Sequence, residues 1–279
     1  MEKLDLVGLH YSSSKPPNPS WMAWGSERAG ALHVDGVEHV GATVSERLAK
    51  GPPRVLGIDA PFGVPTGLAR ALVPLVTNGS QILEHLTVAP SALLDAAWAT
   101  YTTENPGALR LTDALSHGAH SITNTKPPLW RTLRALARVL WSLRDRVSLV
   151  PFDALELSPA RPMVLEVLPA VTLRLLGLPY GLHHAAPEAL AAAGNTAVTA
   201  ERLRVVAGLA AAVSALGARV ELSPHVANAC AQDTSGDAID ALMALVTVFL
   251  ATRGVWSPPP LTGPAATRAL VEGWIVRPG

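Results

Sequence analysis

Short apolar runs that end at proline, glycine or serine predict a series of strands along this chain of 279 residues. Runs of this length are typical of buried strands, and proline ends them because it has no amide hydrogen to donate. Two of the runs carry an acidic residue close to the proline that follows, Asp59 before Pro61 and Glu166 before Pro169. The predicted strands cover residues 4–11, 21–24, 31–34, 55–59, 163–168 and 218–222.

In the rest of the chain, apolar residues mostly recur at the spacing of a helix. Residues from 67 to about 146 are expected to be mostly helical, with helices at 90–100 and 128–143. Capping residues and glycine stops predict further helices at 43–49, 173–178, 199–216 and 237–251, and a last short helix after Pro260.

The order of these elements predicts how the strands pair. The first three strands are expected to form an antiparallel meander, with a hairpin of longer turn at residues 25–30. A helix precedes the strand at 55–59, which implies that this strand pairs in parallel with an earlier one. No linker or internal repeat divides the chain, so we expect one domain over residues 1–279. It would hold a helical insertion at about 67–146 and a C-terminal extension at about 254–279.

Composition limits the classes of partner and compartment. The chain has 22 Lys+Arg and 22 Asp+Glu, so affinity for a polyanion must come from a local patch. Its single cysteine, Cys230, forms no disulfide within the chain and no Cys-x-x-Cys metal site. The apolar helix at 241–251 is too short to span a bilayer, and no signal-peptide pattern occurs at the start. We therefore expect a cytoplasmic protein that does not enter membranes.

Four acidic residues are candidates for a metal site. Asp59 and Glu166 lie at the carboxyl ends of predicted strands, the edge where open α/β sheets bind ligands. Asp237 and Asp240 share one face of the first turn of the apolar helix. Carboxylates that converge repel one another unless a cation is present, and a set of oxygen ligands suits Mg²⁺ or Mn²⁺.

Each acid also has a structural alternative. Asp59 could cap the turn that follows it, and Glu166 could face solvent from an edge strand. The first-turn acids Asp237 and Asp240 are favoured by the helix dipole without any ligand.

The predicted helix at 128–143 carries a basic stripe, Arg131, Arg134 and Arg138, opposite a row of leucines. The stripe could bind phosphates together with Arg110 and Lys126, or it could simply be a solvated face. The adjacent residues His183 and His184 lack the spacing of a helical metal pair, and we expect them in a loop.

Four motifs occur in the order seen in the DUF429 family, which this chain resembles. They are Gly57-Ile58-Asp59-Ala60-Pro61-Phe62-Gly63-Val64-Pro65, Arg110-Leu111-Thr112-Asp113, Met163-Val164-Leu165-Glu166-Val167-Leu168-Pro169-Ala170 and Asp237-Ala238-Ile239-Asp240-Ala241-Leu242. That family looks like a predicted nuclease branch of the ribonuclease H-like superfamily. The resemblance implies a mixed five-stranded sheet of order 3-2-1-4-5 with three antiparallel strands leading and helices on both faces. The pair Asp237 and Asp240 is also similar to the last helix of Holliday-junction resolvases of this superfamily, where both acids serve the metal site.

One residue departs from the family's pattern. The first strand of the family ordinarily reads Gly-Ile-Asp, whereas this chain has Gly8-Leu9-His10. The resemblance places this strand beside that of Asp59, where the missing acid usually bridges two metal ions. An imidazole can give one nitrogen to Mn²⁺ or Zn²⁺, but it cannot bridge and adds no negative charge. His10 is therefore expected as a metal ligand or a general base.

These observations lead to three hypotheses of function. The first is a metal-dependent nuclease or phosphodiesterase, acting on a nucleic acid or nucleotide, with Mg²⁺ or Mn²⁺ as cofactor. Its metal ligands would be Asp59, Glu166, Asp237 and Asp240, its further catalytic residue His10, and its substrate-binding residues Arg131, Arg134 and Arg138. The second is a catalytically inactive binding or scaffold protein that keeps the fold, because His10 impairs the site. The third, a nucleotide-binding phosphotransferase, is least favoured because the chain has no glycine-rich phosphate loop.

Overall fold

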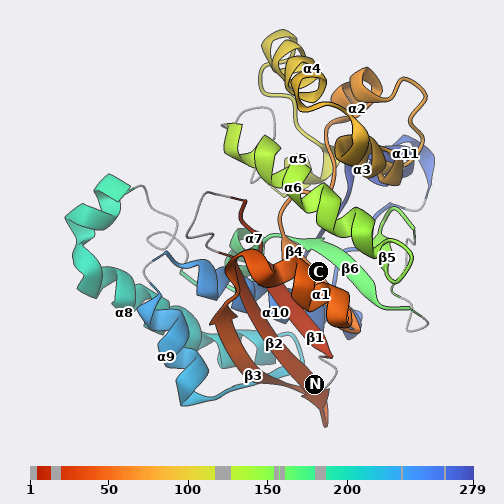
Figure 1. The fold of residues 1–279 in the computed structure, drawn as a ribbon. Coiled ribbons are helices and arrows are strands. Elements are labelled where there is room, and N and C mark those ends of the chain that lie inside the picture. Colours follow the sequence, from red (N-terminus) through yellow and green to blue (C-terminus); the bar gives the residue numbers. More distant parts are fainter. Residues whose placement is uncertain are drawn as a thin grey trace.

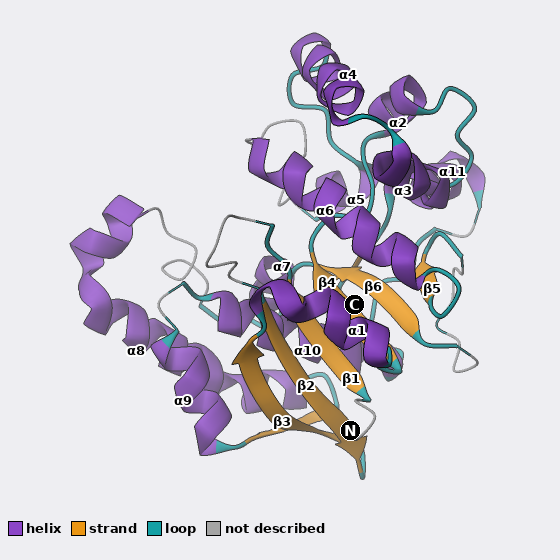
Figure 2. Cartoon of the chain, viewed as in Figure 1, coloured by secondary structure: helices purple, strands orange, loops and turns teal. Residues whose placement is uncertain are grey.

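A single mixed β-sheet with helices on both of its faces makes up the protein, as a computed structural model of the chain shows (Figures 1 and 2). The structure describes residues 5–13, 20–116, 127–153, 157, 161–179, 187–233, 235–260 and 262–279. Within this part of the chain, no helix combines the length and the apolar character needed to cross a bilayer.

The sheet has eight strands in the order β5-β6-β4-β1-β2-β3-β7, with β8 paired to β6 outside this path. Strands β1, β2 and β3 are antiparallel neighbours, and β4 lies parallel to β1, as the helix before it predicts. The strands are β1 (Leu6–His10), β2 (Trp21–Arg28), β3 (Ala31–His39), β4 (Val55–Asp59), β5 (Ser148–Val150), β6 (Met163–Val167), β7 (Arg219–Leu222) and β8 (Ile275–Val276).

The five strands implied by the family resemblance are too few, although the expected order 3-2-1-4-5 is present as β3-β2-β1-β4-β6, and β7 confirms the strand predicted at 218–222. β7 extends the sheet beyond β3, while β5 and β8 both pair with β6. β5 has three residues and β8 has two, so neither is long enough to show the alternation by which a strand is recognised.

The first hairpin is tighter than predicted. β2 and β3 continue to a turn of two residues, Ala29 and Gly30, whose φ angles are 50° and 74°. Positive φ at both central residues is typical of two-residue hairpin turns, whose twist matches that of the flanking strands. The polar residues Ser26, Glu27 and Arg28 therefore belong to β2 and not to a loop.

The helices agree with the predicted positions in most places, and two begin earlier. α7 starts at Pro169, because proline suits the first helical position, and α8 starts at Pro187. α9 was not predicted. The helices are α1 (Val44–Lys50), α2 (Thr66–Leu72), α3 (Gly79–Val88), α4 (Ser91–Glu104), α5 (Leu111–Leu115), α6 (Pro127–Leu143), α7 (Pro169–Leu175), α8 (Pro187–Ser214), α9 (Pro224–Gln232), α10 (Asp237–Thr252) and α11 (Gly263–Glu272).

Two hydrophobic cores lie on opposite faces of the sheet. One is built from α10 with α7, α8 and α9, and the other from α1, α2, α3 and α6. Figure 1 shows α1 and α6 on the near side of the strands and α10 on the far side. The alternation of a strand divides β1 between the cores, because Leu6 belongs to the first and Val7 and Leu9 to the second.

α10 lies unusually close to the centre of the sheet. Gly8 of β1 and Gly57 of β4 are register partners, and both face this helix. A Cβ atom at Gly8 would overlap backbone atoms of Ala241 and Leu245, and one at Gly57 would lie 2.5 Å from the Val248 side chain. The two glycines therefore allow the backbones of helix and sheet to touch, and they fix where α10 begins relative to the strand ends.

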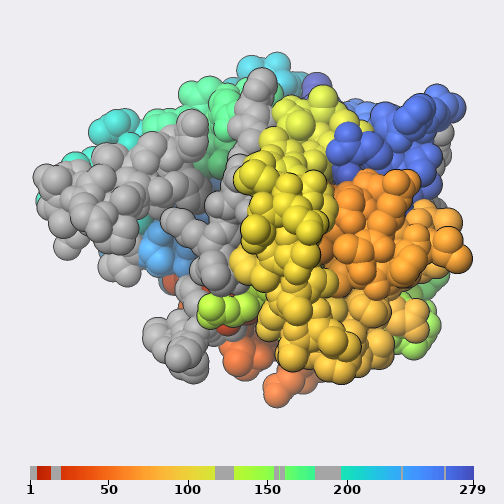
Figure 3. All heavy atoms as spheres, turned by 90° about the horizontal axis from the view of Figure 1, so that it is seen from above, coloured from red at the N-terminus to blue at the C-terminus, as the bar shows by residue number. Residues whose placement is uncertain are grey.

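The helices between β4 and β5 pack together with the C-terminal helix. α11 contacts α2, α3 and α5. In the view from above, α11 (blue) lies beside the orange and yellow segments that contain α2 to α5 (Figure 3). This layer joins segments that are far apart in the sequence. Arg110, just before α5, contacts Glu166 of β6 on the face of the sheet opposite to α10.

We expect Gly8→Ala to lower the free energy of unfolding by about 3 kcal/mol, since the added methyl group meets helix backbone that has no room to move. Urea unfolding followed by circular dichroism measures this change. Gly51→Ala is the control, because a Cβ atom there has no neighbour within 4 Å. Equal stability of the two variants would contradict the close contact of α10 with β1.

Candidate functional site

His10 and Asp59 are paired at the carboxyl ends of two neighbouring parallel strands. They are register partners on β1 and β4, so their side chains lie on the same face of the sheet. This is the face of α10, because Gly8 and Gly57, two residues earlier on each strand, face that helix. The Nδ1 atom of His10 lies 2.8 Å from Oδ2 of Asp59, within hydrogen-bond distance.

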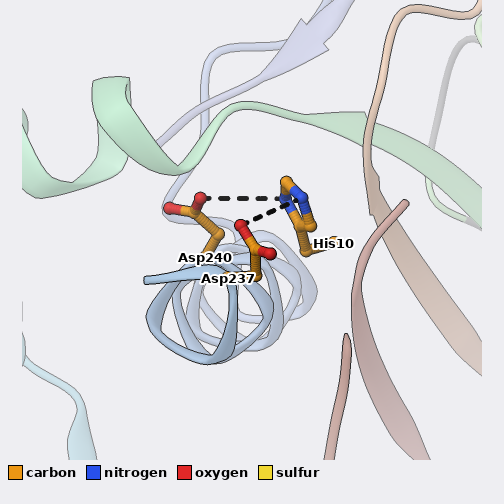
Figure 4. A group of neighbouring side chains, drawn as sticks. All are labelled: His10, Asp237 and Asp240. Atoms are coloured by element: carbon orange, nitrogen blue, oxygen red, sulfur yellow. Dashed lines mark ion pairs between the residues drawn. The ribbon is translucent and has the colours of Figure 1, made fainter. Parts of the chain in front are cut away.

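The first turn of α10 brings two more carboxylates to the same place. Asp237 Oδ1 lies 3.4 Å from His10 Nε2, and Asp240 Oδ2 lies 3.7 Å from His10 Nδ1. Figure 4 shows both acids on the helix and His10 pointing toward them from the strand end. One donor atom from each of these three residues lies within 4.8 Å of the others, so the group could hold a metal ion.

The start of α10 is fixed by Asp233, which comes just before it. Asp233 Oδ2 accepts hydrogen bonds from the backbone amide of Ala238 at 3.0 Å and from Oγ of Ser235 at 3.0 Å. Gly236 follows with a φ of 89°, a conformation that glycine adopts at little cost. These bonds hold the first turn in the orientation that points Asp237 and Asp240 at His10.

The position of His10 changes its protonation. Burial lowers the pKa of His10, but the hydrogen bond to Asp59 and the charges of Asp59, Asp240 and Asp237 outweigh it and raise the pKa to about 9. Burial also raises the pKa of Asp237, and the charge of His10 opposes that rise. At neutral pH, His10 is therefore an imidazolium that partly compensates the carboxylates around it.

A second cation, Arg202 of α8, lies near the same acids and was not predicted. Its side chain is buried and donates a hydrogen bond to the backbone carbonyl of Asp233. Burial lowers the pKa of Arg202, whereas the charges of Asp233, Asp237 and Asp240 act in the opposite direction. A single arginine in a helical segment gives no sequence signal of this contact.

Glu166, the fourth predicted acid, is directed to the other face of the sheet. It is the register partner of Ile58 on β4, and successive residues of a strand point to opposite faces. Glu166 therefore faces away from Asp59, although the two residues lie on neighbouring strands. The structure does not bring its carboxylate into the group formed by His10, Asp237 and Asp240.

Glu166 belongs instead to a buried ionic cluster with Arg110 and Asp113. All three residues are fully buried. Arg110 Nη2 lies 2.6 Å from Glu166 Oε1 and 2.8 Å from Asp113 Oδ1, and Phe62 donates its backbone amide to Glu166 Oε2 at 2.9 Å. The remaining donors of Arg110 reach Asp113 Oδ2, Glu166 Oε2 and the carbonyl of Glu272. Arg110 is therefore not available to bind phosphate, one of the two alternatives left open for it, because all five of its side-chain N–H groups are used.

The arginine stripe of α6 is divided between two environments. Arg134 forms an ion pair with Asp95 of α4 at 2.7 Å, whereas Arg131 and Arg138 are exposed. This face is near the loop after β1, because Thr132 Oγ1 and Ser13 Oγ are 3.0 Å apart. Three other predicted residues, Lys126, His183 and His184, lie outside the described part of the chain.

The donor set of the site fits a divalent cation. The imidazole of His10, oriented by Asp59, and the carboxylates of Asp237 and Asp240 combine a nitrogen ligand with hard oxygen ligands, which suits Mn²⁺ or Zn²⁺ better than Mg²⁺. The four side chains are 4–19% exposed, so they are shielded from solvent and still reachable. His10 must release its proton to bind a metal, because an imidazolium has no free lone pair.

Comparison with known proteins gives one match. A family model described as "Protein of unknown function (DUF429)" matches residues 16–261, which is most of the chain. No curated protein and no solved structure matches it.

We predict that His10 makes stability depend on pH. Its pKa is higher in the folded protein, about 9, than in the unfolded chain, 6.5, so its contribution is complete below pH 6.5 and declines as the pH rises to about 9. The total is on the order of 3 kcal/mol. Urea unfolding of the wild type and of His10→Asn between about pH 6 and pH 9.5 measures it. As the pH rises, the free energy of unfolding of the wild type should fall relative to that of the variant. If the two free energies change with pH in parallel, the predicted ion pairs are contradicted.

We also expect Arg110→Met to lower the free energy of unfolding by about 3–5 kcal/mol, because it leaves two buried carboxylates without their cation. Thermal and urea unfolding measure the loss. Arg131→Met is the matched control, since Arg131 is exposed on α6. A small effect of Arg110→Met, similar to that of the control, would show that the cluster does not stabilise the fold.

Proposed function

The chain belongs to the DUF429 family, and we propose that it is a metal-dependent phosphodiesterase, a nuclease of ribonuclease H-like fold. The ligands of its metal would be His10, Asp237 and Asp240, and Asp59 would orient His10. The succession β3-β2-β1-β4-β6, in which three antiparallel strands come first, supports the proposed fold. The donor set favours Mn²⁺ or Zn²⁺ over Mg²⁺, and both ions can support phosphodiester hydrolysis.

One observation carries this proposal, the convergence of four side chains from three distant segments. His10 and Asp59 are 49 residues apart, and Asp237 and Asp240 come from a helix much later in the chain. Three carboxylates placed around one imidazole repel one another, and this costs free energy that folding alone does not require. Bound cations are a common reason for such an arrangement.

Each side chain has a distinct role in this proposal. A bound divalent cation would lower the pKa of a water ligand and stabilise negative charge on a phosphoryl oxygen. Asp59 orients His10 through the bond to Nδ1, which leaves Nε2 directed toward Asp237. Asp237 and Asp240, held by the first turn of α10, would supply oxygen ligands. The positive charge of Arg202 would partly offset the negative charge of these two acids.

The substrate would cross the carboxyl ends of the strands, because α6 packs on the face of the sheet opposite to His10 and meets the loop after β1 at Ser13 and Thr132. Arg131 and Arg138 are exposed on that helix, and the charge of Arg138 acts on Tyr11, the residue after His10. Phosphate groups of a nucleic acid or nucleotide would pair with these guanidinium groups, which bind phosphate in a bidentate manner. Arg134 would contribute less, because it is engaged with Asp95.

A second function, an inactive binding or scaffold protein that keeps the fold, is favoured by the protonation of His10. The imidazolium pairs with Asp59 and lies near Asp237 and Asp240, so it supplies positive charge where a metal ion would otherwise do so. A site that is compensated in this way can persist without metal. The two functions differ in whether the site still binds a cation at physiological pH.

Titration with Mn²⁺ tests the proposal. We expect saturating Mn²⁺ to raise the melting temperature by roughly 5 °C, the shift that a ligand at about a hundred times its Kd gives a chain of this size. The same ion should support cleavage of fluorescent single-stranded or duplex oligonucleotides. Asp240→Asn should abolish both effects. Glu166→Gln, although less stable, should keep the Mn²⁺ shift because its carboxylate faces the other side of the sheet.

The substitution His10→Asp separates the two functions. It restores the acid that the family ordinarily carries at this position, and it leaves the strand unchanged. A wild type without Mn²⁺ shift or cleavage, together with a His10→Asp variant that gains both, would support the inactive protein. Failure of both proteins to bind Mn²⁺ would exclude the metal site altogether.

A further inference from the structure

A second polar site lies in the helical layer on the other side of the sheet from His10. It is a cavity of about 290 Å³ between α2, α4 and α11. The side chains that define its chemistry are Arg70, Arg268, Glu272, Tyr101, Thr66 and Leu109. None of these residues takes part in the proposed metal site.

The buried carboxylate that lines this cavity already accepts hydrogen bonds from donors of the protein. Glu272 Oε1 accepts hydrogen bonds from the backbone amide of Thr66 at 2.9 Å and from its hydroxyl at 2.5 Å. Glu272 Oε2 accepts the backbone amide of Leu111 at 2.5 Å, and Arg268 binds both oxygens. Glu272 therefore holds Thr66 and Arg268 in place and has little capacity left to bind a cation.

Two exposed arginines also line the cavity. Arg268 uses Nε and Nη2 for Glu272, and its side chain is 44% exposed. Arg70 is exposed on α2, and among the described residues it has no hydrogen-bond or ion-pair partner. Two arginines against one glutamate leave the lining with a charge of +2 − 1 = +1.

Tyr101 and Leu109 give the cavity an apolar wall with one further donor. Tyr101 of α4 packs against α2 so closely that a Cβ atom at Gly67 would lie 2.7 Å from its ring. Burial and the charge of Glu272 raise the pKa of Tyr101, so its hydroxyl keeps its proton. The charge of Arg268 also acts on Tyr101, so the cavity combines an apolar wall with positive charge, which suits an apolar group that carries an anion.

We propose that this cavity binds a small phosphate monoester that carries an apolar or aromatic group. Arg70, Arg268 and Tyr101 come from three different helices, α2, α11 and α4. Donors on three helices that line one cavity suit the three peripheral oxygens of a phosphate, whereas a planar carboxylate offers two. The aromatic or apolar part of the ligand would rest against Tyr101 and Leu109.

Binding of phenyl phosphate tests the proposal, with benzoate and inorganic phosphate as comparison ligands. Calorimetric titration of the full chain in EDTA removes any contribution of a metal at His10, so this result is independent of the proposed nuclease activity. We expect phenyl phosphate to bind more tightly than either comparison ligand. Arg70→Ala should weaken it about tenfold or more, the effect of losing a charge-assisted bond.

Two controls make the outcome decisive. Arg204→Ala, which removes an exposed arginine of α8, should leave the affinity for phenyl phosphate unchanged. Tyr101→Phe should weaken binding by a smaller factor than Arg70→Ala, since only a neutral donor is lost. Absence of binding, equal affinity for benzoate, or equal affinity of the wild type and Arg70→Ala would each overturn the proposal.

Discussion

The contact between the backbone of α10 and the centre of the sheet determines where everything else lies. Gly8 and Gly57 form a flat area across β1 and β4, and Ala241 and Ala244 are small enough to meet it. Because this contact fixes the height of the helix, its first turn begins level with the ends of both strands. The carboxylates of Asp237 and Asp240 then have one position available, beside His10 and Asp59.

The protein buries charge on both faces of the sheet and neutralises it in two different ways. On the face of α11, Arg110 is a permanent cation with every donor occupied by Asp113, Glu166 and a carbonyl oxygen. On the face of α10, the compensating group is a histidine, whose charge can be removed by a proton acceptor or exchanged for a metal ion. The charge of Arg110 is therefore fixed, whereas the charge of His10 can change with pH or with the binding of a metal ion.

Much of this architecture could be predicted from the sequence, because strand ends and helix starts are local features. The proline after Asp59 and the acids before an apolar helix mark the sheet edge and the first turn that meet in the structure. The side of the sheet to which Glu166 points could not be predicted in the same way. That direction depends on register with β4, and a shift of one residue reverses it.

Other parts of the site depend on contacts that leave no local trace. Arg202 and Arg110 are buried by segments far away in the sequence, and an isolated arginine reads as a surface residue. The strands β5 and β8 are too short to have a pattern of their own and form because β6 offers a free edge. The two arginines and the two short strands can therefore be recognised only in the folded structure.

The hydrogen bond from Arg110 to the carbonyl of Glu272 spans 162 residues of sequence. A growing chain that leaves the ribosome amino end first would expose Arg110, Asp113 and Glu166 well before Glu272 and β8 are made. Contacts of such separation form slowly, because a long loop must close before they gain any energy. The layer that contains α2 to α5 can therefore reach its final packing only late in synthesis, and its unfinished form is the state most exposed to chaperones and proteases.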